Sequence, residues 1–188
     1  MTTRRRFLHG VAASSAAGLA GCSTDPRDVY RSNDSSDQAV FDPEPRNVEV
    51  RREIRSLYAA GVRALNAGHD ERELAREQWE RESYTMSAGS YAHAGERYLS
   101  AELAFEEALE LAADLEDGAV AKDISEDAHT AATLYIEATE TGAAMATAAA
   151  DGDEDLAANH HEEFLERVEA ADDQSVSHPE VMSNVLNV

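Results

Sequence analysis

Cysteine, lysine and strand-like patterns are scarce in this sequence. Its 188 residues include one cysteine, Cys22, so no disulfide can form within the chain. Lys122 is the single lysine among sixteen basic residues. No segment alternates apolar and polar residues as a half-buried strand does. These absences exclude a disulfide-stapled fold and argue against a β-sheet domain, so stability must come from the packing of helices.

Familiar catalytic patterns are also missing. The sequence has no glycine-rich phosphate loop, no nucleophile elbow and no pair of carboxylates on an apolar helix face. Its formal net charge of -22 repels phosphates, and no basic stripe follows the first residues. We therefore predict a chain that is not an enzyme, needs no cofactor and does not bind nucleic acid.

The first residues are the basic exception in this acidic chain. Arg4 and Arg5 begin a run of three arginines, and a weakly apolar stretch at 11–21 follows them. That stretch is too short for a transmembrane helix. With Phe7 and Leu8 the arginines resemble a twin-arginine export signal, although His9 stands where lysine is usual. This pathway implies a domain that folds before export.

The apolar stretch ends in a second pattern. Leu19, Ala20 and Gly21 precede Cys22, and together they resemble a lipobox. Lipoproteins of this kind are cleaved before the cysteine, whose thiol then takes lipid. The two patterns resemble those of haloarchaeal lipoproteins exported by the twin-arginine route. The resemblance implies a signal peptide at 1–21 and a chain anchored by Cys22 on the extracytoplasmic face of the cell membrane.

Acidic residues are spread through the rest of the chain. Cleavage before Cys22 would remove three arginines and no acid, which makes the mature chain more negative than -22. A dispersed acidic surface is typical of halophilic proteins, whereas a site for a cationic partner or a metal should be local. The dispersed pattern therefore favours a halophilic surface.

Residues 22–46 are predicted to be a lipidated, flexible linker. The segment is polar, holds three of the four prolines and lacks a sustained apolar period. Asn33 begins an Asn-Asp-Ser sequon, which is a possible glycosylation site in an exported linker.

Residues 47–172 are predicted to form an all-α, antiparallel bundle of about four helices with long central helices. Apolar periodicity places the helices at 48–67, 70–115, 120–150 and 151–171. Gly68 is predicted to end the first helix, and the second is expected to be continuous unless it breaks at 87–90. Residues 173–188 are predicted to be a tail with a short docking helix that begins at Pro179.

Aromatic residues recur every seven positions in the second helix, at Tyr84, Tyr91, Tyr98 and Phe105. This period predicts a coiled-coil-like seam. The helix at 120–150 carries alanine and glycine on its apolar face, so we expect the aromatic rings to pack into those spaces.

Two acidic patterns resemble metal sites. Glu126 and His129 have the Glu-x-x-His spacing of ferritin-like bundles, but that family needs a second such motif. The pair lies off the apolar seam, so it is a weak metal candidate. The acids at 151–162 fit several positions of an EF-hand loop, but Leu156 replaces the required glycine. An acidic helix N-terminus explains them better.

These patterns favour a membrane-anchored lipoprotein whose helical body has a non-enzymatic interaction or structural role. An envelope protein is the expected partner. A ferritin-like metal-binding bundle and a helical-repeat binding module remain alternatives. The helical-repeat alternative rests on Tyr91, Ala94, Gly95 and Tyr98, which faintly resemble the first helix of a tetratricopeptide repeat.

Overall fold

The computed structural model describes residues 45–188, which form five α-helices and, within that range, no strand. These are α1 (Pro45–Glu80), α2 (Tyr84–Ala113), α3 (Ala119–Asp151), α4 (Glu154–Asp172) and α5 (Pro179–Leu186). The all-α prediction is confirmed for this part of the chain. No helix in it combines the length and the hydrophobicity that crossing a membrane requires.

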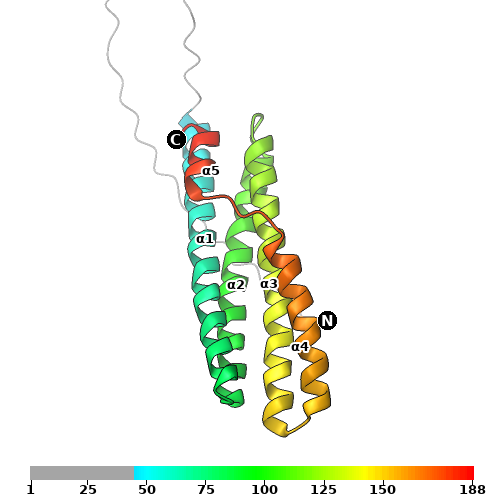
Figure 1. Cartoon of the computed structure of the whole chain (residues 1–188). Coiled ribbons are helices and arrows are strands. Elements are labelled where there is room, and N and C mark those ends of the chain that lie inside the picture. The colour runs from blue at the N-terminus through cyan, green and yellow to red at the C-terminus, as the bar shows by residue number, and fades with distance from the viewer. Residues whose placement is uncertain (1–44) are drawn as a thin grey trace, which may run out of the picture. The chain divides into compact units, whose positions relative to one another are not determined.

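Helices α1 to α4 lie side by side in chain order (Figure 1). Helix α1 packs on α2, α2 on α3, and α3 on α4. Helix α5 returns to the start of α1, where Arg51 Nη1 donates to the carbonyl oxygen of Leu186 at 3.1 Å. The part of the chain that the structure describes therefore holds four long helices and the short helix that was predicted to begin at Pro179.

The first helix is longer than the sequence indicated. Helix α1 continues through Gly68 to Glu80, so the predicted end at Gly68 and the predicted start at Asp70 are wrong. Gly68 is buried against the ring of Tyr98, and a Cβ at Gly68 would lie 2.5 Å from Tyr98 Cε1. The glycine therefore provides space for a ring inside the bundle and is not a helix cap.

The predicted continuous helix at 70–115 is interrupted at residues 81–83. Glu82 has a φ of 57°, a left-handed conformation that a non-glycine residue rarely adopts. Its backbone N–H donates to the carbonyl oxygen of Trp79 at 2.9 Å. Gly89, in the segment 87–90 where a break was considered possible, lies instead within α2. The turn therefore falls where the sequence carries no glycine.

Aromatic rings from α2 fill glycine hollows on both neighbouring helices. Tyr91, Tyr98 and Phe105 are each at most 2% exposed. A Cβ at Gly142 of α3 would lie 2.9 Å from the Tyr91 ring, as the sequence pattern predicted for this pair of helices. The other two rings meet glycines of α1, because Phe105 packs on Gly61 and Tyr98 packs on Gly68.

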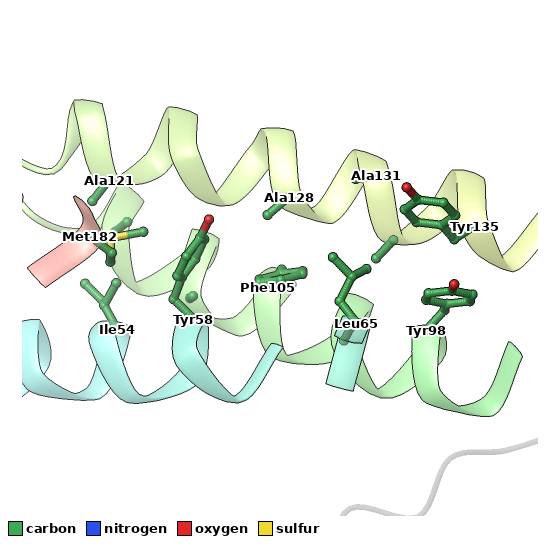
Figure 2. Close-up of a cluster of buried hydrophobic side chains, with 14 of the residues drawn as sticks. Ile54, Tyr58, Leu65, Tyr98, Phe105, Ala121, Ala128, Ala131, Tyr135 and Met182 are labelled. Atoms are coloured by element: carbon green, nitrogen blue, oxygen red, sulfur yellow. The ribbon is translucent and has the colours of Figure 1, made fainter. Parts of the chain in front are cut away.

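The core continues from this seam toward α5. Figure 2 shows the Tyr98 ring of α2 beside the Tyr135 ring of α3, and the two rings stack with centroids 4.9 Å apart. At the other end of the cluster, Met182 of α5 lies between Ile54 and Ala121. A side chain of the last helix thus completes the core between α1 and α3.

The acidic segment after α3 is a turn and a helix start. Gly152 has a φ of 79° and caps α3. The side chain of Asp153 then accepts a hydrogen bond from the backbone N–H of Leu156 at 3.1 Å. Residues from Glu154 onward are helical, which confirms the interpretation as an acidic helix N-terminus.

Candidate functional site

A polar cluster crosses the middle of the bundle. His69 of α1 and Tyr98 of α2 share a hydrogen bond of 2.9 Å between Nδ1 and the hydroxyl oxygen. The hydroxyl of Tyr135 on α3 donates to Asp172 at the end of α4. Arg72 of α1 lies 4.0 Å from Asp172 and 5.1 Å from the centre of the Tyr135 ring. This cluster, His69–Arg72–Tyr98–Tyr135–Asp172, therefore links all four long helices.

Burial determines the protonation of this cluster. It raises the pKa values of Tyr98 and Tyr135 well above that of a free phenol, so both hydroxyls stay protonated. Burial and the charge of Arg72 lower the pKa of His69, against opposing effects of Asp172 and Asp70. His69 is therefore neutral at pH 7.

The side chains of the cluster interact mainly with one another and so hold the four long helices together. Its hydroxyl, imidazole and carboxylate groups pair with one another. The guanidinium of Arg72 lies over an aromatic face, where a cation–π interaction partly replaces hydration. A hollow of about 320 Å³ borders the cluster and is lined by His69 and Tyr135 together with Ser177 and His178. Among these four lining residues, no hydrogen bond joins the Ser177 hydroxyl to either imidazole.

A second aromatic group lies at the end of the bundle where α1 meets α2. Trp79 ends α1 and Tyr84 begins α2, and their ring centroids are 4.9 Å apart with a tilt of 58°. The ring of His161 on α4 lies parallel to the Trp79 ring within 5°, with centroids 6.2 Å apart. We call Trp79, Tyr84 and His161 the end cluster.

The end cluster lines a hollow of about 390 Å³. Its three rings are half-buried, so each presents part of its surface to solvent. Glu154 of α4, an exposed acidic residue, also lines the hollow, and so does Gly152. The remaining lining residues are Ala149, Ala157 and Ala158. The hollow therefore combines aromatic faces, a small apolar wall and one negative charge.

The weak metal candidates lie apart from both clusters. Glu126 is exposed on α3, as expected, while His129 is half-buried. Within residues 45–188 no group of three or more His, Cys, Asp or Glu side chains is arranged to hold a metal ion. His93 and Glu96 of α2 are exposed.

The predicted export and lipidation residues lie outside the described residues. They are Arg4, Arg5, Phe7, Leu8, Leu19, Ala20, Gly21 and Cys22, with the possible glycosylation site Asn33.

Sequence reasoning missed both clusters for one reason. It placed a helix end at Gly68 and a continuous helix at 70–115, so it put His69 in a connecting turn and Trp79 within that second helix. The single tryptophan was the one available signal for the end cluster, because tryptophan is enriched at binding interfaces. The ring partners of Trp79 come from α2 and α4, and no sequence period relates them to it.

Comparisons with protein-family models, with curated proteins and with solved structures find no match to this chain.

Proposed function

We propose that the protein is a lipoprotein held by lipid on Cys22 at the extracytoplasmic face of the cell membrane. Two independent sequence patterns support this proposal. Arg4, Arg5, Phe7 and Leu8 resemble a twin-arginine signal, and residues 19–22 resemble a lipobox. Residues 22–46 would then carry the body away from the lipid surface as a polar linker.

We further propose that the body acts as an antiparallel bundle, with α1 to α4 as its long members, in a non-enzymatic structural or interaction role. The observation that supports this is the use of the aromatic seam in packing. Tyr91, Tyr98 and Phe105 are buried against glycines, and the hydroxyl of Tyr98 is paired with His69. The tyrosine and histidine side chains that could have formed a site thus stabilise the packing of the helices. This suits a spacer or a subunit that presents its outer surface to an envelope protein.

The lipid anchor is tested by changing Cys22 to Ala in the cell. We expect Cys22→Ala to leave the uncleaved precursor or to release the protein from the membrane fraction, because the acceptor thiol is gone. Mass spectrometry of the mature protein and membrane fractionation provide the readouts. The paired change Arg4→Lys and Arg5→Lys should block export while leaving the cysteine in place.

The Cys22→Ala variant tests the lipid anchor, and the paired arginine variant tests the export route. An unchanged mature mass and unchanged membrane fractionation in Cys22→Ala would rule out lipid attachment at this residue. Continued surface delivery of the lysine pair would point to another export route. A Ser23→Ala variant, one residue beyond the lipobox, is the matched control and should behave as the parent protein does.

A further inference from the structure

We propose that the hollow lined by the end cluster binds a small organic cation of the quaternary-ammonium class. The inference goes beyond the proposed function because it does not depend on the lipid anchor. The ligand would enter between the α1–α2 turn and the α3–α4 turn. Its cationic head would lie against Trp79 and Tyr84, with Glu154 at the same wall.

The aromatic rings provide the first part of the recognition. The face of an indole or phenol ring carries negative potential and attracts a cation within about 6 Å of the ring centroid. Trp79 and Tyr84 meet at a tilt of 58° with both rings in the lining, so one ligand can contact both. The turn at 81–83 fixes this geometry, because it joins the helix that ends after Trp79 to the helix that begins at Tyr84.

Local charge provides the second part. Glu154 lines the hollow, and the neighbouring acids Asp151, Asp153 and Asp155 are exposed around it. Two basic side chains that flank Trp79 in the sequence are paired with acids. Arg76 of α1 contacts Glu73 and Glu80, and Arg81, in the turn after α1, contacts Glu77 at 3.1 Å. The hollow therefore favours a cation and disfavours an anion.

Size and wall chemistry specify an organic cation. A hollow of about 390 Å³ falls in the range of small-molecule sites. Calcium and magnesium prefer several oxygen ligands, whereas this lining offers one carboxylate among rings and alanines. Methyl groups on a quaternary nitrogen spread the positive charge over an apolar surface, which matches the aromatic and alanine walls.

Trp79 makes the proposal directly measurable, because it is the single tryptophan of the chain. Its fluorescence is followed during titration with choline at constant ionic strength. The control is 3,3-dimethylbutan-1-ol, which has the same shape as choline without the charge. We expect a saturable change with choline and at least about tenfold weaker binding of the neutral alcohol. Equal binding of the two compounds, or no saturation up to about 0.1 M choline, would overturn the proposal.

Two conservative variants test the assigned residues. Glu154→Gln should weaken choline binding several-fold, whereas Glu166→Gln, an exposed carboxylate farther along α4, should leave the affinity unchanged. Tyr84→Leu should also weaken binding, and its circular dichroism spectrum and melting curve show whether it has folded. Equal affinities for Glu154→Gln and Glu166→Gln would contradict the site, because both changes remove one charge from an exposed position of the same helix.

Discussion

At the scale of single residues, neutral and buried groups hold the helices together. The imidazole of His69 contacts the rings of Tyr98 and Tyr135 edge-on, at centroid distances of 5.5 Å and 4.8 Å. Its Nδ1 pairs with the Tyr98 hydroxyl. Protonating this ring would place a second charge near Arg72 in a poorly hydrated position. The cluster therefore depends on a histidine that stays uncharged.

This dependence predicts an effect of pH on stability. Burial lowers the pKa of His69 below its ordinary value of 6.5, so the unfolded chain binds a proton more readily than the folded chain does. The contribution of His69 is complete above the unfolded pKa and is lost as the pH falls through the folded pKa. We expect His69→Gln to show a smaller loss of unfolding free energy than the parent protein between about pH 7.5 and pH 5.5.

Chemical denaturation at the two pH values measures this effect. His93→Gln is the matched control, because His93 is exposed on α2. Parallel pH profiles for the parent protein and His69→Gln would show that His69 does not carry the dependence.

At the scale of elements, the sequence predicts a helix well where a local signal, such as an apolar face ending in glycine or a proline at the start, marks it clearly. The expected helix at 120–150 corresponds to α3 (Ala119–Asp151), because a regular apolar face is followed by a glycine that adopts a positive φ at Gly152. Pro179 begins α5 as expected of a proline at a first helical position. In both cases local chemistry and tertiary packing agree.

The boundary between α1 and α2 could not be found in this way. Gly68 is the residue type that commonly ends a helix, but its role is set by Tyr98, thirty positions away in the chain. Glu82 takes the left-handed conformation without the usual glycine. The end cluster depends on that turn, so its position could not be predicted from the sequence either. Long-range packing sets the role of Gly68, and the sequence carries no glycine that would have indicated the turn at Glu82.

At the scale of the whole molecule, negative charge opposes folding. The chain carries 38 acidic residues against 16 lysines and arginines, and the exposed faces of the helices hold much of this excess. Mutual repulsion destabilises the compact state when the solution contains little salt. The Debye length falls from about 30 Å at 0.01 M salt to about 3 Å at 1 M, so salt should relieve the repulsion.

We therefore expect the melting temperature to rise from low to molar KCl. Replacing Glu106, Glu107 and Glu110, which are exposed on α2, with glutamine should reduce the steepness of this rise. Thermal melting followed by the circular dichroism signal of the helices supplies the data. A melting temperature that does not depend on KCl would remove the case for a halophilic surface.

The bundle is held together by aromatic rings of α2 that occupy glycine hollows, and one pair of substitutions tests this directly. Gly68→Ala places a methyl group 2.5 Å from a ring atom of Tyr98, whereas a Cβ at Gly89 meets nothing within 4 Å. Overpacking in a core costs about 1–3 kcal/mol, and alanine in place of glycine inside a helix gains about 0.5–1 kcal/mol. In denaturation at high salt, we predict that Gly68→Ala loses about 1 kcal/mol or more and that Gly89→Ala gains stability. A gain in both variants would contradict the packing of Tyr98 against α1.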